Sequence, residues 1–264
     1  MSKISVLVPT YKPEGYIVNC LKSLENQTLS KKEFKVYIAL NGSDKSYENY
    51  VKNLLRKTNF DSELFFLEQS GVSNARNFLI KNSIEPFITF IDDDDVISEN
   101  YLENLLLKAD ENYISIANVY NFEIDVNEKK NNYIGDSFLE LKDIETNKYK
   151  TRKYFSSPWA KLIHRKMIGD VRFDTKLKIG EDSLFMAEIS NKVLGVKKTT
   201  DDTIYFVFER VGSATRKKID KKDEPKRILY LLGKYTKMLF GNYNKIFILT
   251  RIVATIKHLK GVLK

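Results

Sequence analysis

The feature that most constrains the fold is a regular alternation of strand-like and helix-like segments over residues 4–91. Between the strands, apolar residues recur at helical spacing in three segments, which predicts helices near residues 16–24, 47–55 and 72–79. Such an alternation requires right-handed crossovers and predicts an α/β fold, a mostly parallel open sheet flanked by helices. The runs with the length and composition of buried strands are Ile4–Thr10, Phe34–Leu40, Glu63–Leu67 and Phe87–Ile91.

Polar residues follow the ends of three of these predicted strands. Pro9, Thr10 and Tyr11 close the first strand, Asn41 follows the second, and the run 92–95 follows the fourth. The carboxyl ends of parallel strands lie at one edge of an open sheet, and ligands bind beyond that edge. We therefore expect these polar groups to converge on one site.

The four adjacent aspartates, Asp92–Asp95, are the strongest local signal. Adjacent carboxylates repel one another and favour water or a cation. One interpretation is a solvated turn that also caps a helix starting near Ser98. The other is a divalent-cation site, since oxygen ligands without histidine or cysteine suit Mg²⁺ or Mn²⁺. We favour the cation site, because four carboxylates exceed what a turn or a cap requires.

The run from Asp92 to Val96 is also similar to the pattern of the aspartate-nucleophile phosphatases, in which Asp92 would be the nucleophile. That family carries the pattern on the first strand of its fold, whereas three strand–helix units precede it here. No later acidic pair is well placed to complete such a site. The phosphatase therefore remains the alternative function.

Candidate site residues also occur in the second half of the chain. Glu181 and Asp182 precede an apolar segment, so they are expected at a helix N-terminus, as capping acids or as catalytic carboxylates. Trp159 is the single tryptophan and belongs either to the core or to a ligand platform. Arg76 lies in the first turn of a predicted helix, where it suits either the surface or a contact to phosphate or a base.

The positive charge is concentrated near the C-terminus. Residues 217–264 contain 13 basic and three acidic residues, so the net charge of this tail is +10. Residues 1–216 have a net charge of −1, which brings the whole chain to +9. This uneven distribution argues against nucleic acid as a partner. The tail is expected to form a basic amphipathic helix that lies on an anionic membrane surface, packs on the body or makes a homodimer. Its apolar stripe consists of Ile246, Leu249, Ile252, Val253, Ile256, Leu259 and Leu263.

Composition gives a first expectation for the cellular compartment. One cysteine, Cys20, excludes an internal disulfide framework and favours a reducing compartment. The two histidines, His164 and His258, lie far apart, which argues against a zinc site. The first residues run directly into a strand without a signal core. We expect a cytoplasmic protein, and a membrane-binding tail would place it on the inner face of the cell membrane.

The order of short motifs resembles the family-2 glycosyltransferases of the GT-A fold, especially the bacterial enzymes that build surface polysaccharides such as capsules. The resemblance covers roughly residues 3–216 and implies a catalytic domain over 1–216, with a nucleotide-binding half (1–95) and an acceptor half (96–216), followed by the tail 217–264. Its carriers, in chain order, are SVLVPTYKPE, NGSD, GVSNARN, FIDDDD, PWAKLIHR, GEDSLF and YFVFERVGSATR.

This resemblance implies an inverting, metal-dependent hexosyl transfer. The sugar would move from a nucleotide-diphosphate donor, with UDP expected, to a hydroxyl of a saccharide acceptor, expected to be lipid-linked. Asp182 matches the catalytic base, with Glu181 beside it. Asp94 and Asp92 match the ligands of Mn²⁺ or Mg²⁺, with Asp92 also near the ribose.

Further positions match the substrate sites of this family. Trp159 and Lys161 match the acceptor side. On the donor side, the matching positions are Pro9, Thr10, Tyr11, Glu14, Arg76, Asp92 and Asp93.

Two positions depart from the family pattern. Asn41 stands where relatives often carry an aspartate that reads the base, and it can still hydrogen-bond a uracil edge. A histidine that often binds metal near the closing motif is absent, and Arg216 is expected to hold the diphosphate instead. A catalytically silent scaffold of the same fold is a third reading, against which the presence of both Asp94 and Asp182 argues.

Overall fold

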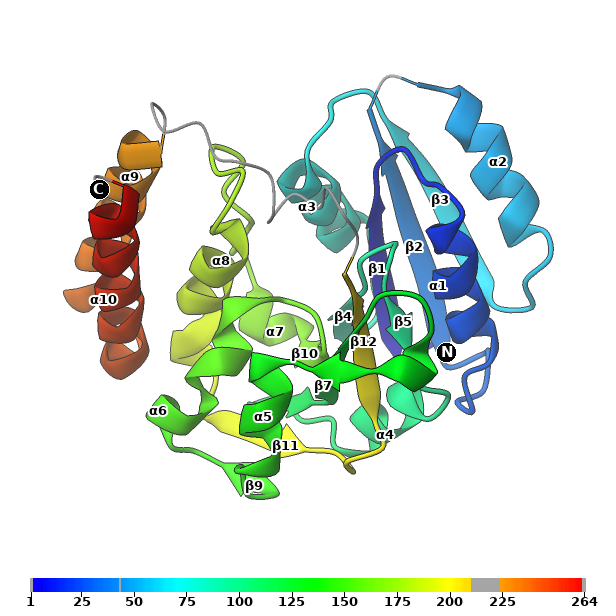
Figure 1. The fold of residues 1–264 in the computed structure, drawn as a ribbon. Helices are drawn as coiled ribbons and strands as arrows, with labels where there is room; N and C mark the ends of the chain where they lie inside the picture. The colour runs from blue at the N-terminus through cyan, green and yellow to red at the C-terminus, as the bar shows by residue number, and fades with distance from the viewer. Residues whose placement is uncertain (1, 43, 210–223, 263–264) are drawn as a thin grey trace.

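The computed structural model describes residues 2–42, 44–209 and 224–262. An eight-stranded sheet forms its centre, in the order β3-β2-β1-β4-β10-β6-β11-β9 (Figure 1). The α/β fold class expected from the sequence is confirmed. The strands of this sheet are β1 (Ile4–Thr10), β2 (Phe34–Asn41), β3 (Asp61–Leu67), β4 (Phe87–Phe90), β6 (Tyr113–Ile116), β9 (Ile144–Glu145), β10 (Lys161–His164) and β11 (Gly195–Lys198).

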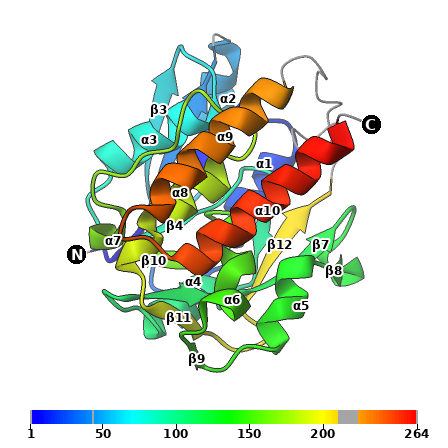
Figure 2. The same cartoon turned by 90° about the vertical axis from the view of Figure 1, so that its left-hand side faces the viewer.

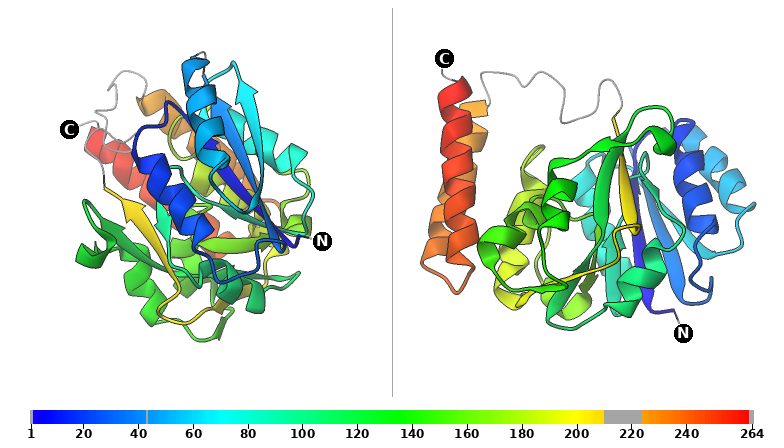
Figure 3. Two further views of the ribbon diagram at one scale, coloured as in Figure 1. Left: turned by 90° about the vertical axis from the view of Figure 1, so that its right-hand side faces the viewer. Right: turned by 60° about the horizontal axis from the view of Figure 1, so that its bottom comes forward.

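The first half of the chain forms the expected strand–helix alternation, with helices α1 (Tyr16–Glu25), α2 (Ser46–Leu55) and α3 (Val72–Asn82). β1 pairs in parallel with both β2 and β4. The strand order therefore reverses beside β1, and α3 lies on the opposite face of the sheet from α1 (Figure 3). Such a reversal point opens a crevice at the carboxyl ends of the strands.

The second half joins the same sheet through β10, which runs antiparallel to both β4 and β6. The sheet is parallel from β3 to β4 and mixed beyond β4. The helices of this half are short, and 3₁₀ turns occupy residues 126–128, 152–156 and 190–192. These helices are α4 (Tyr101–Leu107), α5 (Tyr133–Leu139), α6 (Lys148–Thr151), α7 (Arg165–Ile168) and α8 (Glu181–Ile189).

A second sheet of four strands, in the order β5-β12-β7-β8, lies next to the acidic run. The helix expected near Ser98 is wrong at its start: α4 begins at Tyr101, and Ser98 Oγ accepts a hydrogen bond from Ile204 N at 2.9 Å. The residues before Ser98 form β5 because β12 pairs with them. The strands are β5 (Val96–Ile97), β7 (Asn118–Phe122), β8 (Lys130–Asn131) and β12 (Ile204–Phe208).

The described part of the C-terminal tail forms two antiparallel helices, α9 (Glu224–Leu239) and α10 (Lys245–Val262), where the sequence predicted one. They lie side by side across α8, as Figure 2 shows. Phe247 and Ile248 of α10 are buried, and the ring of Phe247 lies 5.3 Å from that of Phe155. This face of α10 therefore packs on the body.

The apolar stripe predicted for the tail divides between two environments. Ile252 and Leu259 are partly covered, whereas Leu263 lies outside the described residues. None of the helices described has both the length and the hydropathy needed to cross a membrane. The exposed members of the stripe are Ile246, Leu249, Val253 and Ile256.

Candidate active site

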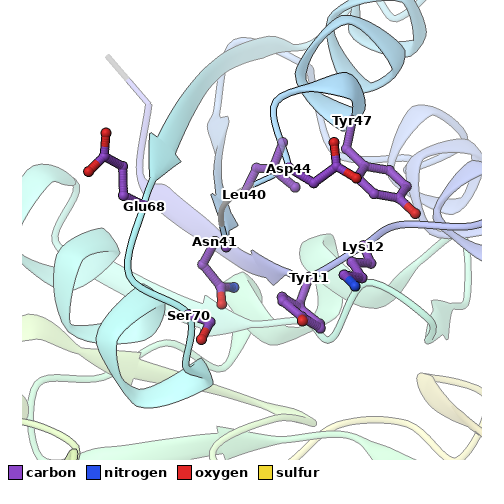
Figure 4. A pocket seen from close by; sticks show the side chains of 9 residues that line it. Tyr11, Lys12, Leu40, Asn41, Asp44, Tyr47, Glu68 and Ser70 are labelled. Carbon is purple, nitrogen blue, oxygen red and sulfur yellow. The ribbon is translucent and has the colours of Figure 1, made fainter.

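A pocket of about 140 Å³ lies at the carboxyl ends of β1 and β2. Figure 4 shows Tyr11, Asn41 and Ser70 among its lining side chains. The pocket thus combines an aromatic ring with hydrogen-bonding groups, which is the chemistry that a nucleoside base requires. The other lining residues are Lys12, Leu40, Gly42, Asp44, Tyr47 and Glu68.

Asn41 fixes the shape of this pocket. Its Nδ2 donates to Thr10 O at 2.7 Å, and its Oδ1 accepts from Gly71 N at 2.9 Å. The side chain therefore ties the end of β1 to the start of α3. Gly42 has a φ of 113°, and a Cβ at this position would lie 2.8 Å from the Tyr11 ring. Only glycine satisfies both the backbone conformation and the close approach of the ring.

Arg76 joins the two halves of the chain. Its guanidinium is 3% exposed, and its Nη2 donates to Asp92 Oδ1 at 2.8 Å while its Nη1 donates to Asp182 Oδ1 at 2.5 Å. Burial lowers the pKa of Arg76, but the charges of Asp182 and Asp92 outweigh burial and raise this pKa above its usual value. Arg76 thus stays charged and holds the two carboxylates close together.

The four aspartates have different environments. Asp95 is 3% exposed and accepts a hydrogen bond from Phe208 N at 2.8 Å, so it fastens the turn to β12. Burial raises the pKa of Asp95, and the charges of Asp92 and Asp94 add to the effect. Asp92, Asp93 and Asp94 are only partly buried. Three carboxylates of the run therefore stay partly accessible, and Asp95 holds the turn in place.

The two acids of the later half lie at the start of α8, as expected. Burial raises the pKa of Asp182, against the charge and hydrogen bond of Arg76. Burial and the neighbouring charge of Asp182 raise the pKa of Glu181 to about 7. Glu181 Oε2 is buried and has no hydrogen-bond partner within the described ranges. An acid with a pKa near neutrality is suited to proton transfer.

Trp159 and Lys161, the residues predicted for the acceptor side, have different surroundings. Trp159 is partly buried, and its ring stacks on Tyr205 at 5.1 Å between centroids. Lys161 is 1% exposed, and its Nζ donates to Ser157 O and Trp159 O. Burial lowers the pKa of Lys161 to about 7, against the charge of Asp182. Lys161 thus holds the Trp159 backbone, and a direct role of either side chain toward an acceptor stays a prediction.

The remaining predicted donor residues lie at the first strand and beyond it. Pro9 and Thr10 are buried, and Thr10 Oγ1 has no hydrogen-bond partner among the described residues. Glu14 is exposed and lies just before the start of α1. Arg216 lies outside the described residues.

The acidic turn offers few protein ligands for a metal. In the described ranges, no group of three or more histidine, cysteine, aspartate and glutamate side chains is arranged to hold an ion. This fits Mg²⁺ or Mn²⁺ bound through one or two carboxylates, with the substrate phosphates and water completing the coordination. The described residues do not fit a closed metal site in which protein side chains supply all the ligands.

Tyr205 is a site residue that the sequence analysis did not find. It is fully buried in β12, and Asp92 N donates to its hydroxyl at 3.1 Å. It thereby connects the acidic turn to the Trp159 ring. The available signal was its place in the closing motif, although no local pattern shows that its hydroxyl reaches Asp92.

Residues 5–172 match the sequence profile of "Glycosyl transferase family 2". The chain is similar to the glycosyltransferase GlyA of Streptococcus pneumoniae, with 31% identity over 81% of this chain and 32% of that protein. It is also similar to the poly(ribitol-phosphate) beta-N-acetylglucosaminyltransferase TarS of Staphylococcus aureus, with 25% identity over 80% of this chain and 36% of TarS. The chain thus spans about a third of the length of these two curated relatives.

Solved structures share the fold. TarS 1–349 in complex with UDP-GlcNAc aligns with a TM-score of 0.76 and 22% identity, over 96% of this chain and 72% of that one. The mannosyltransferase PcManGT from Pyrobaculum calidifontis, in complex with GDP-Man and Mn²⁺, aligns with a TM-score of 0.63 and 14% identity, over 97% and 69%. The fold is thus the GT-A type that the sequence resemblance implied.

Proposed function

This chain belongs to glycosyltransferase family 2, and we propose that it transfers a sugar from a nucleotide-diphosphate sugar to a hydroxyl of a saccharide acceptor in the synthesis of a bacterial surface polysaccharide. The observation that carries this proposal is the contact of Arg76 with both Asp92 and Asp182, because it brings the donor-side and base-side carboxylates together. The pocket at β1 and β2 supplies a place for the nucleoside base of the donor.

The proposed donor is a UDP-sugar. TarS, whose complex contains UDP-GlcNAc, supports this choice through the shared fold. In the pocket, the Tyr11 ring is 51% exposed and is available to stack on the base. Asn41 retains one N–H and further lone pairs beyond its two backbone contacts, which suits the edge of uracil.

Asp94 and Asp92 are the proposed ligands of Mn²⁺ or Mg²⁺, and the complex of PcManGT with Mn²⁺ supports a divalent ion. Such an ion, when bound, supplies positive charge to the departing diphosphate. Arg76 contributes a second positive charge from its buried position, where electrostatic interactions are stronger than in water.

Asp182 is the proposed general base. It accepts the proton of the acceptor hydroxyl while that oxygen forms its bond to the anomeric carbon and the bond to the diphosphate oxygen breaks. Displacement from the opposite side inverts the anomeric centre. Arg76 keeps Asp182 oriented, since its Nη1 is hydrogen-bonded to Oδ1. Glu181 lies beside it as a second carboxylate whose pKa is about 7.

The acceptor is proposed to be a lipid-linked saccharide that reaches the site past Trp159. The partly buried indole is stacked on Tyr205, so one aromatic surface is fixed near the cleft. Aromatic rings of this kind bind the apolar faces of sugars. Synthesis at the inner face of the cell membrane follows from such an acceptor, and the exposed face of α9 and α10 is the proposed contact with lipid.

The test of the function is release of nucleoside diphosphate from a panel of UDP-, GDP- and dTDP-sugars, with saccharide acceptors and with Mn²⁺ or Mg²⁺. We expect acceptor-dependent release of UDP from one UDP-sugar. No release from any donor would contradict the proposal. Formation of a phospho-Asp92 adduct from a phosphate monoester would instead support the phosphatase, but the family match and the ion pair of Asp92 with Arg76 favour the transferase.

A further inference from the structure

A second cavity, of about 320 Å³, lies between the start of α8 and the helices α9 and α10. This volume corresponds to roughly ten water molecules, which is enough for a phosphate group and part of its substituent. Ile179 and Gly180 form one wall and directly precede the two acids at the start of α8. The cavity therefore adjoins the segment that carries the proposed catalytic base, and α9 and α10 lie on the far side of α8 from β1 and β2 (Figure 1).

The lining of this cavity is cationic. Arg227, Arg251 and His258 all line it, and none of the described lining residues is a carboxylate. The hydroxyl-bearing residues Ser183, Tyr235 and Thr255 complete the polar part of the wall, and aliphatic side chains form the rest. Such a lining combines hydrogen-bond donors with positive charge, which favours an anion over a neutral ligand.

The charges around the cavity do not balance. The carboxylate of Glu224 lies beside the cavity; it is 2% exposed, forms an ion pair with Arg227 and is hydrogen-bonded to His258. Within residues 2–42, 44–209 and 224–262, no carboxylate forms an ion pair with Arg251. Its Nε is buried and has no hydrogen-bond partner there. A buried guanidinium N–H without a partner is uncommon and costly. Within the described residues, the Nε–H of Arg251 is therefore left without a partner.

Arg227 links this cavity to the reaction site. Its Nη1 donates to Ile179 O at 2.8 Å, and its other nitrogens pair with Glu224. A ligand bound by Arg251 would thus lie against the segment that positions Asp182. This placement suits a group carried by the acceptor better than one carried by the donor.

We propose that the cavity between α8, α9 and α10 is a binding site for a phosphate group, held by the guanidinium of Arg251 and carried by the acceptor. The guanidinium fork matches the oxygens of a phosphate in two parallel hydrogen bonds. The assignment to the acceptor rests on the proposed transferase function, whereas the assignment of the site to phosphate does not. Free inorganic phosphate is the other source of the same chemistry.

The first experiment measures binding of inorganic phosphate to the full chain by calorimetry, with chloride at matched ionic strength. We expect saturable binding that persists with UDP and Mn²⁺ present, and that weakens about tenfold or more in Arg251→Gln, because a charged partner of the phosphate is lost. Arg251→Lys should recover part of the affinity. Lys257→Gln is the matched control, since Lys257 is exposed on the same helix and does not line the cavity.

Unchanged affinity in Arg251→Gln, or no saturable binding to the parent, would overturn the site. A second experiment then identifies the source by comparing an acceptor that bears phosphate with one that lacks it. We expect Arg251→Gln to raise KM about tenfold for the phosphate-bearing acceptor alone. An equal change for both acceptors would overturn the acceptor assignment and leave free phosphate as the ligand. Phosphate binding without transfer from any donor would defeat the transferase proposal and leave the phosphate site standing.

Discussion

Arg76 is the residue on which the geometry of the site depends. It is buried, and it forms ion pairs with Asp92 from the first half of the chain and with Asp182 from the second. Without the guanidinium, two carboxylates would face each other across the cleft and repel. Their shared contact with Arg76 explains how acids from distant segments lie close together.

A substitution at the proposed base, Asp182, separates donor binding from the transfer step. In Asp182→Asn the amide keeps the shape of the side chain but cannot accept the acceptor proton. We expect turnover to fall by about a hundredfold or more, in the range of general-base removal, while the affinity for UDP changes little. Glu181→Gln is the comparison, with a smaller loss. Turnover near that of the parent in Asp182→Asn would exclude this residue as the base.

The raised pKa of Glu181 predicts how the free energy of unfolding depends on pH. Its pKa of about 7 lies above its usual value, so the folded state binds more protons than the unfolded state between about pH 4.5 and 7. Stability from this residue is therefore largest below that window and decreases as the pH rises through it, by up to a few kcal/mol. Urea unfolding of the parent and of Glu181→Gln at pH 5 and pH 8 measures this. The decrease should be smaller in the variant, and an equal decrease would refute the assignment.

At the scale of elements, strand β12 holds the acidic turn in place. Phe208 N donates to Asp95, and the Tyr205 hydroxyl accepts from Asp92 N while its ring supports Trp159. One strand of the small sheet therefore contacts both the acidic turn and Trp159. The turn is held by contacts with residues far from it in sequence.

Tyr205→Phe tests this role. The ring and its stacking on Trp159 remain, but the buried hydroxyl contact to Asp92 N is lost. We expect a loss of about 1–2 kcal/mol in the free energy of unfolding, together with weaker binding of UDP in the presence of Mn²⁺. Tyr120→Phe in the neighbouring strand β7 is the control, because Tyr120 is only partly buried. Identical unfolding curves for the parent and Tyr205→Phe would contradict the proposed role of β12.

Elements with a strong local pattern could be predicted from the sequence, and elements made by long-range pairing could not. Ile4–Thr10 was expected as a strand and is β1, since its run of apolar residues is sufficient by itself. Val96–Ile97 forms a strand only because it pairs with Tyr205 and Phe206. α9 was not predicted, because the continuous apolar stripe of the tail belongs to α10.

The same distinction applies to the site. Asp92, Arg76 and Asp182 were each predicted from a local motif, and the structure brings them together. The contact of Tyr205 with Asp92 joins residues 113 positions apart, which no local spacing reveals. The unpartnered Nε of Arg251 likewise follows from the packing of α9 and α10 and has no signature in the sequence.

At the scale of the whole molecule, the outer face of the α9–α10 pair combines exposed apolar and basic side chains. The exposed basic residues of this pair are Lys226, Lys237, Lys245 and Lys257. Glu224 is the single acid within α9 (Glu224–Leu239) and the described part of α10 (Lys245–Val262), and it is buried. This charge suits an anionic lipid surface. The exposed apolar residues of this face are Leu229, Phe240, Ile246, Leu249, Val253 and Ile256.

Vesicle flotation tests the contact with lipid. We expect the parent to float with vesicles containing phosphatidylglycerol and to bind neutral vesicles weakly. The double variant Leu249→Glu, Val253→Glu should bind anionic vesicles about tenfold less, because two half-exposed apolar contacts are replaced by like charges. Ile84→Glu, at an exposed isoleucine elsewhere, is the control. Equal flotation of the double variant and the parent would remove the membrane role.

The central claim is that one cleft holds a metal-bound nucleotide diphosphate on the acidic turn and faces a separate base. Calorimetric titration of UDP into the parent, Asp94→Asn and Asp182→Asn, each with and without Mn²⁺, tests it directly. The account predicts tight UDP binding only with Mn²⁺, a loss of about tenfold or more in Asp94→Asn, and near-parent affinity in Asp182→Asn. UDP binding that is independent of Mn²⁺ and unchanged in Asp94→Asn would contradict it.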